Sequence, residues 1–354
     1  MINKPDALKM ASVIIPTYDR PQDLALCLQV VIRQQARIPL EFIVVDNHPE
    51  SDVTPSVVAQ FPGVKLVTQP LKGLSYARNA GVHASQGDVL LFIDDDILVT
   101  EHWAETMLAT FSRDDIMAVT GRVLPYSTQT QAEHLFETYI SFDRGPESQE
   151  YGTQWFKSFW KRSVPTHYIG GGGNSAIRRS AFSNPRIGLF NERLGAGTPI
   201  GSAEDQYCFY KILKAGYSIV YQASAEVLHK HRTNEEALYK QLLAYGKAVV
   251  GYELECLVDE HDWRALLELA VVLPVWHLRN FFQILVCFAI RREVPEHARL
   301  DMTSLHGNLL GFNAWYRSRK RLKRMGASPA LRPINFPAGA LTNVASDSIA
   351  SHRA

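Results

Sequence analysis

The sequence predicts an α/β protein with a mostly parallel central sheet covered by helices on both faces. Short unbroken runs of Val, Ile, Leu and Phe alternate, over the first hundred residues, with segments whose apolar side chains recur at helical spacing. Unbroken apolar runs are typical of strands buried on both faces. Polar motifs directly follow these runs, at the strand ends where open α/β sheets bind ligands. The 354 residues suffice for two domains, or for one large domain with an appendage.

The expected elements follow one another in a regular order. Buried strands are expected at 12–16, 40–45, 64–68 and 89–93. Helices are expected between them at 21–35, 54–60 and 74–84. Farther along, a helix that ends at Gly216 precedes a strand at 217–221, and residues 236–258 have the spacing of a long helix. This alternation predicts βαβ connections and parallel pairing of the first strands.

Charge and cysteine content narrow the classes of function. A net charge of +1 over the whole chain gives no reason to expect nucleic-acid binding. The four cysteines lie far apart and form no Cys-x-x-Cys pair, which favours a reducing compartment and no structural zinc. The first residues lack the apolar core of a signal peptide. We therefore expect a cytoplasmic protein.

Asp94, Asp95 and Asp96 are the most informative residues of the chain. They follow the strand expected at 89–93, so three carboxylates stand side by side at the end of a buried strand. A divalent cation would relieve their repulsion, and Asp-x-Asp offers the hard oxygen ligands that Mg²⁺ or Mn²⁺ shares with phosphates. The alternative is an acidic turn or the start of a helix at 97–111, where carboxylates are also favoured.

Two segments in the middle of the chain interrupt the alternating pattern. Residues 125–168 are polar and rich in aromatic side chains, which predicts either a segment that covers substrate or extra core packing. Trp155 and Trp160 could each stack on an acceptor ring or belong to the core. Residues 170–173 are four consecutive glycines, where the backbone bends or approaches a neighbour closely. No Gly-Lys-Ser/Thr follows, so a P-loop is not expected.

Several short motifs occur between residues 11 and 232. They are Val-Ile-Ile-Pro-Thr-Tyr-Asp-Arg at 13–20, Val-Val-Asp-Asn at 44–47, Gly-Leu-Ser-Tyr-Ala-Arg-Asn-Ala-Gly at 73–81, Gly-Asp at 87–88, Phe-Ile-Asp-Asp-Asp at 92–96, Glu-Asp at 204–205 and His229. Each motif is weak alone, but the ordered set resembles that of the family 2 glycosyltransferases. The resemblance implies the GT-A fold and a metal-dependent, inverting transfer of a sugar from a nucleoside diphosphate.

Two positions depart from the family pattern, both in the expected nucleotide pocket. Asp19 stands where the family more often has Asn, and Asn47 follows Asp46 where an acidic pair is common. The base of the donor is therefore the open part of the prediction. We expect a UDP-sugar first, with GDP- and dTDP-sugars as alternatives.

The resemblance implies a role for each acidic group and histidine of the motifs. Asp96 is the expected direct ligand of Mn²⁺ or Mg²⁺, Asp94 contacts the metal or the ribose, and Asp95 contacts the ribose or the donor sugar. His229 is the expected third contact of the metal. Its alternative is a strand histidine that faces solvent, and His231 would share the same strand face.

Asp205 is the expected general base. An inverting transfer needs one carboxylate beside the acceptor hydroxyl and no covalent intermediate. A helix N-terminus would lower the basicity of Asp205, and the neighbouring Glu204 would raise it. The alternative for residues 202–205 is a helix start that resembles a capping box.

Donor and acceptor contacts are expected from the remaining motif residues. By resemblance, the donor nucleotide is contacted, besides the acidic triplet, by Pro16, Thr17, Asp19, Asp46 and Arg78. The alternatives are a turn-forming aspartate and a solvated helix arginine. The acceptor, a glycan or a lipid-linked saccharide, is expected beside Gly172, Gly173, Asn174 and Trp155.

The last third of the chain is expected to be helical. Polar residues interrupt the apolar stretch 264–290, so buried helices or an interfacial hairpin are expected rather than a transmembrane helix. Six of the eight residues 317–324 are basic. This run predicts either attraction to an anionic membrane or a solvated basic helix that could form a homodimer surface. Residues 326–354 are rich in Pro, Ala and Ser and are expected to be a mobile tail.

These observations predict a domain organisation. A catalytic domain is expected at 1–235, with a nucleotide-sugar half at 11–120 and an acceptor half at 121–235. A helical extension is expected at 236–325, in contact with the cytoplasmic face of a membrane or with a second copy of the chain.

Two other functions fit parts of the sequence. A nucleotidyltransferase also uses a metal on an α/β sheet, but it would normally need a glycine-rich basic loop near the first strand, which residues 16–20 do not provide. The non-enzymatic alternative is a membrane-tethered sugar-binding protein with a degenerate site. The intact Asp-x-Asp, Glu-Asp and His229 set argues against it.

Overall fold

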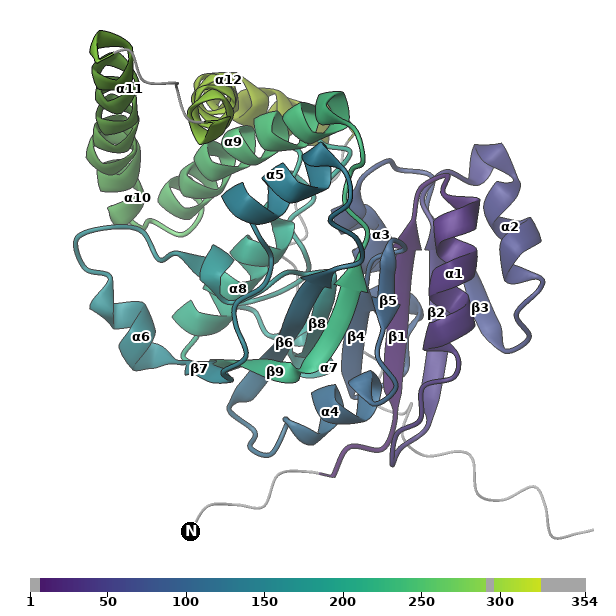
Figure 1. The fold of residues 1–354 in the computed structure, drawn as a ribbon. Coiled ribbons are helices and arrows are strands. Elements are labelled where there is room, and N and C mark those ends of the chain that lie inside the picture. Colours follow the sequence, from purple (N-terminus) through teal and green to yellow (C-terminus); the bar gives the residue numbers. More distant parts are fainter. Residues whose placement is uncertain (1–6, 291–295, 326–354) are drawn as a thin grey trace, which may run out of the picture.

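The computed structural model describes residues 7–290 and 296–325, and a nine-stranded sheet forms its centre (Figure 1). The strand order is β3-β2-β1-β4-β8-β6-β9-β5, and β7 pairs with β9. The strands are β1 (Ala11–Thr17), β2 (Leu40–Asp46), β3 (Val64–Thr68), β4 (Val89–Ile93), β5 (Ile97–Val99), β6 (Ile116–Pro125), β7 (Gln149–Tyr151), β8 (Asn174–Arg178) and β9 (Ser218–His229).

The first four strands are parallel, as the alternating pattern predicts. β1 lies between β2 and β4, and every residue of β1 and β4 is buried. The second half of the sheet is mixed: β8 is antiparallel to β4 and β6, whereas β6 and β9 are parallel. Parallel pairing puts the carboxyl ends of β1, β2 and β4 at one edge, which becomes the floor of the site.

Helices cover both faces of the sheet. One face packs on α1 (Pro21–Val31), α2 (Val53–Val58) and α4 (Trp103–Ala109). The other packs on α3 (Leu74–Ala84), α7 (Arg179–Ser183) and α8 (Glu204–Lys214). Helix α1 ends four residues earlier than expected, because the side chain of Gln34 turns inward and donates to the carbonyl of Thr100 at 2.8 Å.

The segment after the acidic triplet corrects the helix considered at 97–111. Ile97–Val99 is strand β5, and only Trp103–Ala109 is helical. β5 pairs with the end of β9, which is longer than the strand expected at 217–221, and Ile97 lies opposite His229. The apolar side chains of Ile97 and Val99 join the sheet core, and this tertiary pairing outweighs the local helix preference.

The aromatic segment 125–168 folds into short helices and a short strand. It contains α5 (Gln131–Tyr139), β7 and α6 (Thr153–Ser158). A capping box between Thr130 and Glu133 begins α5. In α6, the Trp155 ring meets the Tyr151 ring edge-to-face, with the centroids 4.9 Å apart. The core-packing alternative therefore holds for Trp155, whereas Trp160 is 64% exposed.

Two long helices form the centre of the C-terminal region. α9 (Glu235–Val258) begins at the cap Asn234, whose side chain accepts from the backbone of Ala237 at 2.8 Å. α12 (Glu296–Arg324) packs along α9, and the two backbones approach closely at Gly246 and Gly307. The helix predicted at 236–258 is thereby confirmed.

The apolar stretch 264–290 is not buried, so the expectation of buried helices was wrong, and it forms one succession of helical segments rather than a hairpin. It forms α10 (Arg264–Leu267), a π-helical turn (Glu268–Val272) and α11 (Leu273–Ala289) in succession. Helix α11 stands at the outside of the molecule (Figure 1). Over the described residues, one helix, Arg264–Cys287, is long and apolar enough to cross a membrane, and none of its most apolar window is buried.

The basic run 317–324 forms the end of α12, and part of it is bound to the rest of the protein. Arg319 pairs with Asp259 of α9 at 2.8 Å. Arg321 donates to the carbonyl oxygens of Lys72 and Gly197 at 2.7 and 3.0 Å. The tail expected at 326–354 lies outside the described residues.

Candidate active site

The acidic triplet and the end of β9 meet at the carboxyl edge of the sheet. Asp96 Oδ1 and His229 Nε2 lie 3.5 Å apart, and the backbone N–H of Lys230 donates to the Asp96 carbonyl at 3.0 Å. The β5–β9 pairing fixes this arrangement, because Ile97 is registered opposite His229. Asp96 and His229, 133 residues apart in sequence, therefore share one end of the site.

The structure distinguishes His229 from His231. The Nδ1 atoms of the two rings lie 3.1 Å apart, but their Nε2 atoms face different partners. His229 Nε2 faces Asp96, whereas His231 Nε2 lies 2.6 Å from Glu137 Oε1 of α5. The His231 ring also packs on the Phe136 ring, with the two ring centroids 4.3 Å apart. Of the two histidines, His229 is the one placed beside the acidic triplet.

Arg20 is a site residue to which the sequence analysis gave no role. Its Nη1 lies 2.7 Å from Asp96 Oδ2 and 3.1 Å from Asp95 Oδ1. Arg20 could have been recognised from its position as the N-cap of α1, because a positive charge is unfavourable beside the N-terminal end of the helix dipole. A basic residue there points to a nearby acidic partner.

The pKa values of Asp95 and Asp96 shift in opposite directions. Burial raises the pKa of Asp95 to about 7, and the charge of Asp96 adds to this effect against the attraction of Arg20. Burial also acts to raise the pKa of Asp96, but the hydrogen bond to His229 and the charge of Arg20 outweigh it and hold that pKa below its usual value. Asp96 is therefore the member of the pair that stays ionised most readily.

Arg78 is a buried cation that joins two carboxylates. Its Nη2 lies 2.9 Å from Asp94 Oδ1, and its Nη1 lies 2.7 Å from Glu204 Oε1. The side chain is 1% exposed, so the alternative of a solvated helix arginine was wrong. The guanidinium therefore holds Asp94 and Glu204 close to each other.

Glu204 and Asp205 begin α8 and have different surroundings. Burial raises the pKa of Glu204 to about 7, and the neighbouring charge of Asp205 contributes to this rise. Asp205 is half-buried and accepts two backbone N–H groups at 2.7 Å each, from Gly172 to Oδ2 and from Gln206 to Oδ1. The helix N-cap is Ala203, which makes no side-chain cap, so residues 202–205 do not form a capping box.

The glycine run packs directly against the carboxylates. A Cβ atom on Gly172 would stand 2.5 Å from Asp205 Cβ, and one on Gly173 would stand 2.5 Å from Asp94 Oδ2. Real Cβ atoms do not approach so closely. The bare backbone therefore admits the acidic side chains of the protein itself, in addition to any acceptor.

Asn174 differs from its expected place on the acceptor side. Its Oδ1 accepts from Trp103 Nε1 at 2.8 Å, and its Nδ2 donates to the carbonyls of Arg122 and Ala225 at 3.0 and 3.1 Å. With its polar atoms engaged and 1% of its surface exposed, the side chain links β8 to β6, β9 and α4. Trp155 is partly buried against the core, so neither it nor Asn174 is included among the proposed acceptor contacts.

The residues expected to contact the nucleotide, Thr17 and Asp46 among them, lie at the carboxyl ends of β1 and β2. Asp46 Oδ1 accepts from the His48 N–H at 3.0 Å, whereas its buried Oδ2 has no hydrogen-bond partner in the part of the chain that is described. Thr17 Oγ1 donates to Asp95 Oδ2 at 2.7 Å, and Pro16 precedes it within β1. The unpartnered carboxylate oxygen is available for a ligand's N–H group.

Aromatic and basic side chains that the sequence analysis did not select border this end. The rings of Tyr18 and His48 stack with their centroids 4.7 Å apart. Lys72 Nζ lies 4.3 Å from the Tyr18 ring centroid and 3.1 Å from its hydroxyl. Asp19 Oδ2 lies 3.7 Å from His48 Nδ1, and Asp19 has a positive φ of 58°. Asp19 was predicted from its motif, but Tyr18, His48 and Lys72 carry no recognisable local signal, because the cluster joins three separate loops.

The donor atoms at Asp96 and His229 fit a divalent cation. Two neighbouring ligands at about 2.1 Å from an octahedral Mg²⁺ lie about 3.0 Å from each other, so a shift of about 0.5 Å would bring the observed 3.5 Å separation to this geometry. Over residues 7–290 and 296–325, no three His, Cys, Asp or Glu side chains already converge as a complete metal site. Substrate oxygens and water would have to supply the remaining ligands, which is usual for Mg²⁺ bound with phosphates.

A comparison with protein families decides the class. The family model for glycosyl transferase family 2 matches residues 12–184, which include β1 to β4, the acidic triplet and the glycine run. The protein is a glycosyltransferase with a family 2 domain. The family resemblance is thereby confirmed for the motifs within residues 12–184, whereas Glu204, Asp205 and His229 lie beyond the matched region.

Related glycosyltransferases extend the likeness beyond the matched domain. Glycosyltransferase AglE of Haloferax volcanii is 26% identical over 241 residues, which cover 66% of this chain and 71% of AglE. Glucosyl-dolichyl phosphate glucuronosyltransferase of the same organism is also 26% identical, and the alignment covers 77% of this chain and 87% of that protein.

A solved structure identifies the fold of this glycosyltransferase. Mannosyltransferase PcManGT from Pyrobaculum calidifontis, solved with GDP-Man and Mn²⁺, superposes with a TM-score of 0.56 at 15% identity. The superposition covers 85% of this chain and 86% of the mannosyltransferase. The fold is GT-A, with a helical C-terminal region, as the sequence motifs predict.

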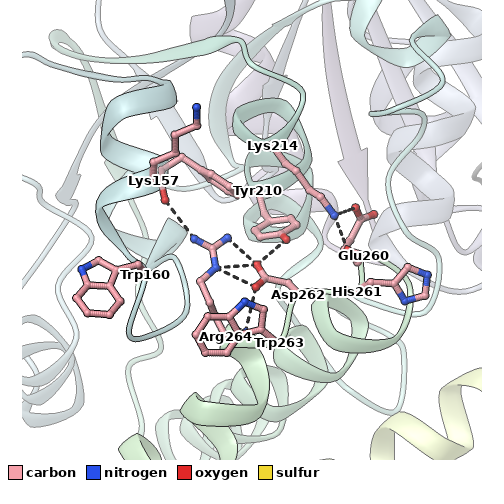
Figure 2. A pocket seen from close by; sticks show the side chains of 10 residues that line it. Lys157, Trp160, Tyr210, Lys214, Glu260, His261, Asp262, Trp263 and Arg264 are labelled. Atoms are coloured by element: carbon pink, nitrogen blue, oxygen red, sulfur yellow. Dashed lines mark hydrogen bonds and ion pairs between the residues drawn. The ribbon is translucent and has the colours of Figure 1, made fainter.

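Two cavities of the glycosyltransferase differ in their relation to this site. One of about 310 Å³ is lined by Asp96, His231 and Lys230 among others, and so adjoins the acidic triplet. The other, of about 390 Å³, lies between α6, α8 and the start of α10 (Figure 2). Its lining includes Trp160, Trp263 and the Asp262–Arg264 ion pair but no residue of the acidic triplet, so it is a separate feature.

Proposed function

We propose that this glycosyltransferase transfers a sugar, with inversion at the anomeric carbon, from a nucleoside diphosphate sugar to an acceptor hydroxyl. The observation that carries the proposal is the carboxylate of Asp205, held by two backbone N–H groups beside Gly172 and within the same cluster as Asp94 and Glu204. A fixed, half-exposed carboxylate suits a general base. In the proposed reaction the acceptor hydroxyl gives its proton to Asp205 while its oxygen attacks the anomeric carbon.

Asp96 and His229 are the proposed protein ligands of a divalent cation. When bound, Mn²⁺ or Mg²⁺ would neutralise charge on the leaving diphosphate. The support is the 3.5 Å separation of Asp96 Oδ1 and His229 Nε2, together with the Mn²⁺ that accompanies the structurally similar mannosyltransferase. Asp94 stands on the other side of the triplet, where Arg78 orients it toward the donor.

The proposed nucleotide pocket consists of Thr17, Asp46 and the stacked rings of Tyr18 and His48. The unpartnered Oδ2 of Asp46 would accept an N–H group from the base. UDP is our first expectation for the donor, with GDP and dTDP as alternatives. A thermal-shift screen of the three nucleotide sugars with Mn²⁺ would rank them, because a ligand stabilises the folded state in proportion to the logarithm of its saturation.

The proposed acceptor is a saccharide on a lipid carrier or on a glycan chain. Two similar proteins support this class: one acts on glucosyl-dolichyl phosphate, and another is an O-antigen chain rhamnosyltransferase. Such acceptors would place the reaction in surface-glycan or glycolipid synthesis. The cavity beside Asp96 is the proposed entry for the acceptor.

Substitution of the base tests the mechanism. We expect Asp205→Asn to bind the donor like the wild type but to lose transfer by about 10³-fold or more, because the amide cannot take the proton. Donor affinity by calorimetry and transfer by product release are the two measurements. Asp114→Asn, in an exposed turn, is the matched control and should retain full activity. Wild-type turnover in Asp205→Asn would remove Asp205 from the mechanism.

Metal removal tests the cation separately. We expect EDTA to abolish transfer and Mn²⁺ or Mg²⁺ to restore it. His229→Gln should raise the Mn²⁺ concentration needed for half-maximal activity by about tenfold to a hundredfold. His134→Gln, at an exposed position of α5, is the matched control and should leave this concentration unchanged. Full activity in EDTA would contradict the metal assignment.

The two alternative functions make different products. A nucleotidyltransferase would release pyrophosphate, and the glycosyltransferase relatives give that function no support. A degenerate sugar-binding protein would release nothing. Slow release of free sugar and nucleoside diphosphate, without acceptor, is the outcome that favours the transferase.

A further inference from the structure

We propose that the α10–α11 helix and the adjoining face of α12 form a membrane-docking face, which inserts into one leaflet of a bilayer without crossing it. The face consists of Val275, Leu278, Phe282 and Leu285 of α11 with Leu309 and Phe312 of α12. This inference concerns attachment to a lipid surface and does not depend on the donor, the metal or the base proposed above.

The apolar side chains of α11 lack protein cover. Leu278 is 65% exposed and Phe282 is 66% exposed, the values of side chains that project into solvent. The spacing of the four α11 residues, three, four and three positions, places them on one side of the helix. An exposed apolar face of this extent marks an interaction site in a folded protein.

The width of the face favours lipid over a second helix. Phe281 and Val286 are also exposed and broaden the apolar side of α11. On the opposite side, half-buried residues face α12, and there His277 Nε2 contacts Asn308 Nδ2 at 2.7 Å. A coiled-coil partner would need a narrow seam with charged flanks, whereas a lipid surface accepts a wide apolar arc.

The path of the chain excludes a single crossing of the membrane. The 24-residue helix Arg264–Cys287 is about 36 Å long, enough for a hydrocarbon core of about 30 Å. However, residues 290–295 span at most about 20 Å before α12 begins. Near the start of α12, Asp301 Oδ1 accepts a hydrogen bond from the hydroxyl of Tyr139 in α5 at 2.7 Å, which holds that end of α12 on the catalytic domain. Both ends of the apolar helix therefore lie on the side of the catalytic site.

Aromatic and basic side chains stand where an interface would be expected. Trp160 and Trp263 are more than half exposed at the cavity next to the start of α10 (Figure 2), and Lys161 Nζ lies 4.3 Å from the Trp160 ring centroid. Exposed tryptophan is enriched at the headgroup level of membranes. On α12, the apolar face continues into the exposed Lys320 and Lys323, which would attract anionic lipid.

Vesicle flotation with the full-length protein tests the docking face. We expect the wild type to float with phosphatidylglycerol-containing vesicles and, more weakly, with phosphatidylcholine vesicles. Leu278→Ser with Phe282→Ser should reduce vesicle binding about tenfold or more, because two large apolar side chains are lost from the lipid contact. The exposure of both residues predicts an unchanged melting temperature and unchanged release of nucleoside diphosphate from the donor. The matched control is Leu26→Ser, at an exposed position of α1, and this variant should float like the wild type.

Two further measurements separate the alternatives. In sealed vesicles, external protease should remove tags at both termini; protection of the C-terminal tag alone would overturn the one-leaflet arrangement. Light scattering measures the molar mass in solution and so tests whether a second copy of the chain covers the docking face. A wild-type dimer that does not float, and that the double substitution converts to a monomer, would overturn the proposal in favour of self-association.

Discussion

Single residues decide the geometry of the candidate site through two arginines and two glycines. Arg20 and Arg78 each join two carboxylates, so four acidic groups gather without a large net repulsion. Gly172 and Gly173 leave the space that Asp205 and Asp94 occupy. The loss of one partner from a buried ion pair costs about 3–5 kcal/mol, because an uncompensated charge remains.

Gly173→Ala tests the role of the bare backbone. The added Cβ would displace Asp94 from its place beside Arg78, so we expect transfer to fall about tenfold to a hundredfold while the protein stays folded. Gly171→Ala is the matched control, since a Cβ there meets nothing within 4 Å. Equal activities of the two variants, measured as initial rates at saturating donor, would contradict this role.

At the level of elements, close packing joins α9 and α12 into one unit, and ion pairs attach this unit to the catalytic domain. A Cβ on Gly307 would stand 2.7 Å from the carbonyl oxygen of Leu243 and 2.8 Å from the Cα of Gly246. Arg193, Glu255 and Arg319 add a buried ionic network between the helices and the loop before α8. α12 can therefore hold the docking face in a fixed position relative to the site.

Gly307→Val should separate these helices. We expect the overfilled contact to lower the free energy of unfolding by about 1–3 kcal/mol. Met302→Ala, at an exposed position of the same helix, should cost much less. Thermal unfolding and the rate of proteolysis within 296–324 are the measurements. A melting temperature equal to that of the wild type would show that the two helices can separate at no cost.

At the level of the whole molecule, a buried carboxyl couples the stability of the fold to pH. Glu253 of α9 accepts from the hydroxyl of Ser163, and burial raises its pKa from 4.5 to about 8. The folded state therefore holds this proton more tightly than the unfolded state. The resulting stability is fully present below pH 4.5 and is lost as the pH rises through about 8.

Glu253→Gln should flatten this dependence. We expect the melting temperature of the wild type to fall between pH 5 and pH 8, and that of the variant to fall by several degrees less. The matched control is Glu236→Gln, at an exposed position of the same helix, and its melting temperature should change with pH as that of the wild type does. The reason is that Lys240 lowers the pKa of Glu236 from its usual value of 4.5, which is already below this pH range. Parallel melting curves for Glu253→Gln and the wild type would exclude Glu253 as the source.

The N-terminal half of the fold was predictable because its signals are local. Unbroken apolar runs gave β1 to β4 within a residue or two, and α3 and β4 match their predicted bounds. The helix considered at 97–111 failed because the partner of β5 lies more than a hundred residues away, at the end of β9. The exposure of α11 could not be predicted from its composition, because a buried helix and a lipid-facing helix have similar apolar content.

The sequence by itself determined the family, the succession of the first strands along the chain and the identity of the acidic residues, since motifs and periodicity are properties of neighbouring positions. The tertiary structure alone decided which groups meet. It placed His229 rather than His231 beside Asp96, brought Arg20 to the acidic triplet, and turned Asn174 into a link between strands. These outcomes depend on strand register and on contacts between distant segments, which no local pattern encodes.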